Sequence, residues 1–361
     1  MIEERAYWLA WMCIHRVGPI LLKRIYIHFG SLAIAWQAPM NDLLAVGGIG
    51  EALAQYIVSQ RPRIAPASLF DDMTDRFITP SDSAYPQLLF EICDPPPVLY
   101  YSGRLELLEQ YNQRFSVGVV GTRRPTDYGR QWTRQITHQL VQSGSLIISG
   151  LASGIDRVAH QVALDNKGDT IAVLGTGVDV IYPAANAQLY KRISETGLLL
   201  SEYPSGTSPD RTNFPKRNRI IAGLSRAVIV TEAPERSGAL ITAHLANDYG
   251  REVYALPGSL DNSQIEGCLH LINQGAQIIL GLKPLMEALS LLPPVQTEAA
   301  SHPELDEQLD RIYQEIPPDG IGLDGLVERL GIDTGILIGA LIKLELMGFI
   351  QQSPGARYRR S

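Results

Sequence analysis

Residues 214–243 read FPKRNRIIAGLSRAVIVTEAPERSGALITA, and this stretch contains one unit of a pattern that repeats along the chain. Its apolar run at 227–230 is short, as strands buried on both faces of a sheet are, and a helical stretch precedes it. Lys216, Arg217 and Arg219 stand in a predicted loop immediately ahead of that helix. This local positive charge needs an explanation, because the chain has a formal net charge of −7.

Similar short apolar runs occur on both sides of this stretch. They are FSVGVVG (115–121), SLIISG (145–150), TIAVLGTG (170–177), GLLLSEYP (197–204), EVYALPG (252–258) and QIIL (277–280). Amphipathic helical stretches separate most of these runs. The alternation predicts an α/β fold with a mainly parallel sheet and helices on both faces.

The N-terminal flank of this central domain has a helical pattern. Residues 1–62 predict a small helical module, and LLAVGGIGEALAQYIV (43–58) is similar to a helix-hairpin-helix element. The glycine turn of such an element can approach a DNA phosphate, and a purely structural helical pair is equally compatible with the sequence. Residues 63–113 are proline-rich and predict a connector into the central domain at 114–292.

The C-terminal flank predicts a third part of the chain. Residues 293–304 form a polar linker, and residues 305–361 predict three helices, a turn at Gly348 and a short hairpin, an order typical of a winged helix. The last of these helices has few basic residues, so we favour a protein-contact or structural role over reading of DNA.

A binding crevice is expected beyond the carboxyl ends of the parallel strands, where such sheets bind ligands. Glycine turns at 121–124, 150–154 and 175–177 fall there, and so does the basic loop at Lys216. Exposed backbone amides and helix N-termini favour anions, as do clustered cations. We therefore expect an anion-binding rim.

Two carboxylates, Glu202 and Glu232, also fall at strand ends. They could act as general acid and general base in the cleavage of a ribosidic bond. Alternatively, they could pair with neighbouring arginines and hold the crevice in shape. We favour the second interpretation.

Several classes of protein are not indicated. No apolar run approaches the roughly 20 residues that cross a bilayer, and the N-terminus is acidic, so a cytoplasmic protein without a membrane partner is expected. The three cysteines lack metal-ligand spacing. Neither a P-loop nor a complete dinucleotide fingerprint occurs, so we expect no metal and no cofactor.

Six segments resemble successive signature blocks of the DNA-processing protein A family, also called DprA or Smf. They are VGVVGTRRPTDYG (117–129), ISGLASGIDRVAHQVAL (148–164), VLGTGVDVIYPAAN (173–186), NFPKRNRIIAGLS (213–225), SGALITAHLANDYGREVYALPG (237–258) and LINQGA (271–276). The flanking modules resemble the family's three-part layout.

The resemblance implies a non-enzymatic, extended Rossmann-like protein that binds single-stranded DNA and loads the RecA recombinase onto it, notably in natural transformation. It also implies a homodimer. Tyr128, Tyr182 or Phe214 would stack a base. The implied DNA-binding residues are Gly121, Thr122, Arg123, Arg124, Ser153, Gly154, Asp156, Lys216, Arg217, Asn218, Arg219, Ser237, Gly238 and Thr242.

The chain departs from the family pattern at one loop, where Ile265 and Leu269 replace polar residues, so we leave both out of the expected site. The alternative is a nucleotide-cleaving phosphoribohydrolase of the related fold. Such enzymes carry a PGGxGTxxE motif whose glutamate is catalytic, and the equivalent stretch here, TEAPERSGALITA (231–243), lacks both the double glycine and the glutamate on the following helix.

Overall fold

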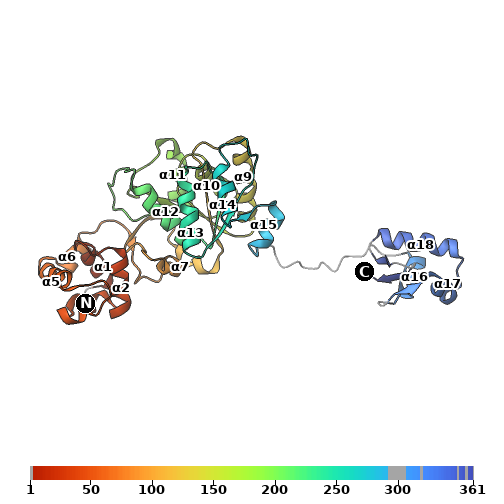
Figure 1. Ribbon diagram of the computed structural model, residues 1–361, viewed down its shortest axis with the longest axis horizontal. Helices are drawn as coiled ribbons and strands as arrows, with labels where there is room; N and C mark the ends of the chain where they lie inside the picture. The colour runs from red at the N-terminus through yellow and green to blue at the C-terminus, as the bar shows by residue number, and fades with distance from the viewer. Residues whose placement is uncertain (1–2, 292–305, 318–319, 348, 354–356, 361) are drawn as a thin grey trace. The chain divides into compact units, whose positions relative to one another are not determined.

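A computed structural model describes residues 3–291, 306–317, 320–347, 349–353 and 357–360 (Figure 1). Contacts divide the chain into two compact units, Met1–Leu292 and Pro293–Ser361. The predicted N-terminal module, connector and central domain therefore lie together in the first unit. The predicted linker at 293–304 lies outside the described residues.

The N-terminal region is helical, as the sequence predicts. Trp8, Trp11 and Leu22 are buried at its centre. Gly48, at φ 97°, makes the predicted turn with a backbone conformation that side chains disfavour. Its elements are α1 (Glu4–Met12), α2 (Pro19–Phe29), α3 (Leu32–Gln37), α4 (Met40–Leu44), α5 (Glu51–Gln60), η1 (Arg61–Arg63) and α6 (Pro66–Asp71).

A nine-stranded sheet forms the centre of the first unit, in the order β1-β2-β6-β5-β4-β3-β7-β8-β9. In this spatial order, every neighbouring pair from β6 through β5, β4, β3, β7 and β8 to β9 is parallel. β1 and β2 add an antiparallel edge. The strands are β1 (Phe77–Ile78), β2 (Leu99–Gly103), β3 (Ser116–Gly121), β4 (Leu146–Ser149), β5 (Thr170–Leu174), β6 (Leu198–Ser201), β7 (Ala227–Glu232), β8 (Glu252–Ala255) and β9 (Gln277–Ile278). This confirms the mainly parallel sheet, and the predicted connector contributes two of its strands.

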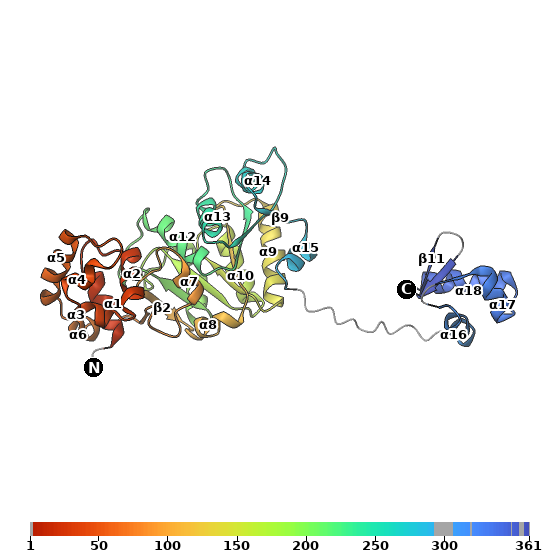
Figure 2. The same ribbon diagram turned by 60° about the horizontal axis from the view of Figure 1, so that its bottom comes forward.

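Helices cover both faces of the sheet, as the apolar strands require (Figure 2). Along β7, Ala227 and Ile229 pack on one face and Val228 and Val230 on the other. The first face packs against α9 (Asp127–Gln142), α10 (Ile155–Asp165) and α15 (Leu282–Ala288), and the second against α12 (Asn213–Gly223), α13 (Gly238–Asp248) and α14 (Glu266–Asn273). The remaining elements are α7 (Gln87–Glu91), α8 (Glu106–Glu109), η2 (Tyr111–Gln113), η3 (Ala184–Asn186) and α11 (Ala187–Thr196).

The order of strands places a switch point at β3. The chain runs from β3 through β4 and β5 to β6 on one side, and then returns to β7 on the other side of β3. Connections therefore leave the carboxyl ends of β3 and β7 in opposite directions, and a crevice opens between them.

The second unit is a winged helix, as the sequence predicts. It contains α16 (Glu307–Gln314), β10 (Ile321–Gly322), α17 (Leu323–Leu330), α18 (Thr334–Leu346), β11 (Ile350–Ser353) and β12 (Arg357–Arg360), with strand order β10-β12-β11. Ile312, Leu326 and Leu341 are buried in its core, while Ile336 and Ile342 of α18 are exposed. The predicted turn at Gly348 lies outside the described residues.

In the ranges that the structure describes, no helix combines the length and the apolar character needed to cross a membrane.

Candidate functional site

A crevice of about 790 Å³ lies at the switch point, beyond the carboxyl ends of β3 and β7. Ten of the fourteen residues predicted for the site line it: Gly121, Thr122, Arg123, Arg124, Asp156, Arg217, Asn218, Ser237, Gly238 and Thr242. The other four line adjoining hollows. Ser153 borders a small cavity of about 90 Å³, Gly154 borders a hollow beside α10, and Lys216 and Arg219 border a third hollow beside α12.

The turn after β3 presents two exposed cations. The Thr122 amide donates to the Glu232 carbonyl oxygen (2.7 Å), which ties the turn to β7. The Thr122 hydroxyl accepts from the Arg124 amide (3.2 Å), which holds the turn itself. Arg123 and Arg124 are exposed, and neither forms an ion pair with any described residue. They remain available to a bound anion.

The turn before α10 packs directly on the turn after β3. Gly154 has φ 85°, and the Ile155 amide donates to the Thr122 carbonyl oxygen (3.2 Å). A Cβ atom at position 154 would overlap that oxygen and would lie 2.7 Å from the Arg123 Cα atom. Only glycine fits at position 154. The close packing of the turn before α10 on the turn after β3 therefore depends on this glycine.

The basic segment at Lys216 is not a loop, and this part of the sequence prediction is wrong. Residues Asn213–Gly223 form α12. Pro215 is accommodated because it lies in the first turn, where a backbone N–H has no partner within the helix. Successive side chains of a helix point about 100° apart, so the cations cannot all face the crevice.

Arg217 points into the protein. Its side chain is buried, and its guanidinium donates to the carbonyl oxygens of Gly150 (2.6 Å) and Val173. Asp156 accepts from the Gly150 amide (3.1 Å) and the Ala152 amide (3.4 Å). Burial raises the pKa of Asp156, and the charge of Arg217 opposes this shift. Burial also lowers the pKa of Arg217 to about 10, so the guanidinium stays charged at neutral pH. Together these two side chains hold the turn that leads to α10.

Arg219 is also buried and paired. Its guanidinium contacts Glu202 at 2.6 Å and Asp94 at 3.0 Å. Lys216 is exposed and Asn218 is half-buried, with the Asn218 amide donating to the Gly238 carbonyl oxygen (3.2 Å). The four predicted residues of α12 therefore divide into two buried arginines and two residues that reach the surface, Asn218 in the crevice and Lys216 in the neighbouring hollow.

Glu232 is fully buried and holds the start of α9. Its carboxylate accepts from the Thr126 amide (2.7 Å) and the Thr126 hydroxyl (2.6 Å). Glu202 pairs with Arg219. Glu202 is thus paired with an arginine, as predicted, whereas Glu232 is held by Thr126 and forms no ion pair with an arginine among the described residues.

Aromatic rings line one wall of the crevice. Tyr182 and Phe214 stack with centroids 5.3 Å apart, and the Arg123 guanidinium lies over the Phe214 ring at 5.8 Å. Tyr182 is 39% exposed, so part of this ring pair is open to a ligand. Tyr128, the third aromatic residue predicted to stack a base, is not part of this lining; it is 40% exposed, and its hydroxyl donates to the Pro257 carbonyl oxygen (2.9 Å).

Two further arginines line the crevice that were not assigned to the site from the sequence, Arg211 and Arg236. Arg211 lies two residues ahead of α12, and Arg236 precedes Ser237, whose hydroxyl caps α13. The position of each next to a helix start is a signal that could have identified it. Ile265 is fully buried, which agrees with its omission.

The parallel sheet and the crevice at its switch point, lined by several cations, define a Rossmann-like protein. The family model described as DNA recombination-mediator protein A matches residues 76–290, and a model described as the DprA winged helix domain matches residues 296–356. The chain belongs to the DNA recombination-mediator protein A family.

Similar proteins agree with this assignment. Protein Smf of Synechocystis is 44% identical over 99% of both chains, and Protein Smf of Escherichia coli is 37% identical over 90% of this chain and 89% of its own. The X-ray structure of DNA processing protein A from Streptococcus pneumoniae has a TM-score of 0.68 at 35% identity, covering 79% of this chain and 98% of its own. A structure of the Helicobacter pylori protein, described as revealing a single-stranded DNA binding mode, has a TM-score of 0.54 at 32% identity, covering 60% and 97%.

Proposed function

We propose that this protein acts in DNA processing by binding single-stranded DNA in the crevice, with little sequence preference. The observation that carries the proposal is the pair of exposed, unpaired arginines, Arg123 and Arg124, beside the partly open Tyr182–Phe214 ring pair. Cations bind phosphates of any sequence, and aromatic rings stack on any base. The H. pylori relative with a described single-stranded DNA binding mode supports the same substrate.

A single strand fits this site better than a duplex. Sequence-specific duplex binding places a helix or a β-ribbon in a major groove about 12 Å wide. Here the cations and rings line a crevice with a volume of about 790 Å³. An unpaired strand can enter this crevice with its bases turned toward the rings. Within the same proposal the protein is not an enzyme, as the family resemblance implies; the pairing of Glu202 with Arg219 and of Glu232 with Thr126 is compatible with a structural role for both carboxylates.

The proposal extends to delivery of the bound strand to the RecA recombinase by a cytoplasmic homodimer, as the family resemblance implies. The edge of the sheet supports the dimer, because no strand among the described residues pairs with the outer side of β9, and Leu280, two residues beyond it, is 74% exposed. Sedimentation of wild type and Leu280→Glu checks the dimer. Assembly of recombinase filaments on strands coated with single-strand-binding protein checks delivery.

The DNA-binding proposal is tested by mobility shift with single-stranded and duplex oligonucleotides of one sequence. We expect the wild type to prefer the single strand and to lose affinity as salt rises. Arg123→Ala is expected to weaken binding of all sequences alike and to reduce the salt slope by about 0.7, the value for one phosphate contact of a single strand. Arg63→Ala is the matched control, since Arg63 is exposed and lies in η1, outside the crevice. Equal affinity for duplex, or equal effects of the two variants, would contradict the proposal.

A further inference from the structure

A second basic surface lies beside the crevice, in a hollow of about 520 Å³ between α9 and α10. Arg130 and Arg134 come from α9, one helical turn apart, and Arg157 comes from α10. Arg123 and Arg124 complete the arginines of its lining, which contains no aspartate or glutamate. We call this surface the arginine hollow.

Most of the charge in the arginine hollow is not neutralised. Arg130 contacts Asp127 at 3.3 Å, but that carboxylate is fully exposed. Arg134 and Arg157 are exposed and have no hydrogen-bond or ion-pair partner among the residues that the structure describes. Like charges held close together repel one another, so this arrangement costs stability unless an anion occupies it. Because the chain has a net charge of −7, a cluster of unpaired arginines differs in sign from the overall charge of the protein.

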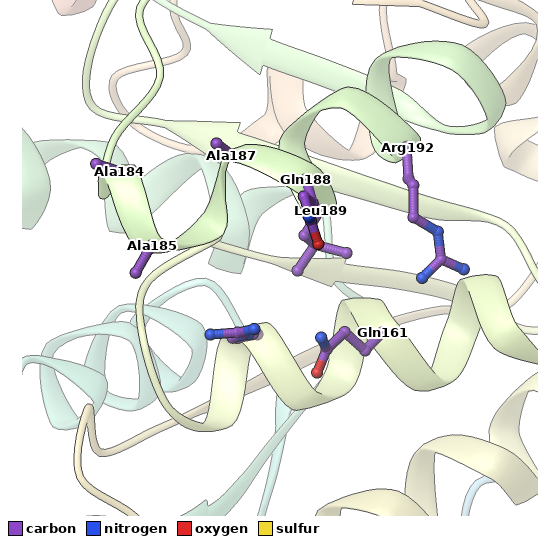
Figure 3. A pocket seen from close by; sticks show the side chains of 8 residues that line it. Gln161, Ala184, Ala185, Ala187, Gln188, Leu189 and Arg192 are labelled. Atoms are coloured by element: carbon purple, nitrogen blue, oxygen red, sulfur yellow. The ribbon is translucent and has the colours of Figure 1, made fainter.

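The arginine hollow is continuous with its neighbours. It shares Arg123 and Arg124 with the crevice. On its other side it shares Arg157 and Gln161 with a hollow of about 370 Å³ between α10 and α11. Figure 3 shows this last hollow, with Gln161 on one helix facing Gln188 and Leu189 on the other and Arg192 at one end. Arg192 pairs with Asp165 at 2.7 Å, so the unpaired charge ends near Arg157.

We propose that a single strand bound in the crevice continues past Arg123 and Arg124 into the arginine hollow, where Arg134 and Arg157 contact its phosphates. This inference rests on the proposed function and adds the direction in which the strand leaves the crevice. A polyanion fits these observations because it needs a row of cations with no carboxylate between them, and the shared arginines provide one. The bases need no partner here, so the second segment binds without regard to sequence.

The test compares strands of two lengths. Anisotropy titrations would use fluorescent oligothymidylates of about 6 and about 20 nucleotides, one near the lower end and one beyond the upper end of the roughly 4–16 nucleotides that a single-strand-binding OB fold covers. The variant is Arg134→Gln with Arg157→Gln. Its matched control is Arg63→Gln with Lys167→Gln, which removes the same charge from two exposed positions outside all of these hollows.

We expect the variant to bind the short strand like the wild type and to bind the long strand roughly tenfold more weakly at low salt. The salt slope for the long strand should fall by about 1.4, the value for two single-strand phosphate contacts. Gln161→Glu should also weaken only the long strand, because it places a carboxylate in the lining while both arginines remain.

The inference is overturned if the variant and the wild type bind the long strand with equal affinity. It is also overturned if the affinity of the variant for the short strand falls as much as its affinity for the long strand. If the wild type binds neither strand, the proposed function itself fails. Melting curves that match the wild type exclude unfolding as the cause of any loss.

Discussion

Replacing Arg217 by methionine is expected to lower the free energy of unfolding by about 2–4 kcal/mol, because each buried acceptor that loses its donor costs roughly 1–3 kcal/mol. The substitution leaves the carbonyl oxygens of Gly150 and Val173 without their donor and leaves Asp156 as a buried carboxylate without its neighbouring cation. Urea titration followed by circular dichroism measures the change.

Lys216→Met is the matched control, because it removes the same charge from the preceding residue, which is exposed. Its expected effect on the free energy of unfolding is within about 0.5 kcal/mol. If both variants are as stable as the wild type and both lose DNA affinity, Arg217 contacts the phosphates directly and does not support the crevice wall from within.

Gly154→Ala is expected to lower the free energy of unfolding by at least about 2 kcal/mol and to weaken binding of single-stranded DNA more than tenfold. An alanine Cβ atom would overlap the Thr122 carbonyl oxygen, and φ 85° is unfavourable for any residue with a side chain. This overlap can be removed only if the turn before α10 moves away from the turn after β3. Such a movement would displace Arg123 and Arg124. Thermal melting and anisotropy titration measure the two effects.

Gly238→Ala provides the comparison for Gly154→Ala. Gly238 also lines the crevice, but it begins α13 and a Cβ atom there would have no atom within 4 Å. This variant should be unchanged or slightly more stable, by about 0.4–1 kcal/mol. A stable Gly154→Ala protein with normal affinity would show that the contact between the turns is not needed for binding.

The fold was predictable because its signal is local. Each parallel strand is a short apolar run, and along β7 neighbouring residues such as Ile229 and Val230 pack on opposite faces, so both must be apolar. The rim could also be located, because glycines such as Gly121 and Gly150 stand at the ends of these runs. Whether the fourteen predicted residues bind DNA stays a prediction.

The environments of the cations could not be read in the same way. The basic segment was predicted as a loop, and the helix that includes Pro215 in its first turn gives no distinct signal in the sequence. Burial of Arg217 and Arg219 depends on partners such as Glu202 and Asp94, which only the tertiary fold brings near. A cation that supports a binding site and one that contacts the ligand therefore look alike in sequence.

The antiparallel edge of the sheet determines where the chain can be divided. β2 pairs with β6, Tyr111 is buried against Leu224 and Ser116, and Asp94 holds Arg219 of α12. A fragment that begins at residue 114 would expose one side of β6 and leave Arg219 with a single partner. We therefore expect a piece of this protein that folds alone to include Asp94 and β2, and a transfer of the crevice to another protein to carry that preceding segment with it.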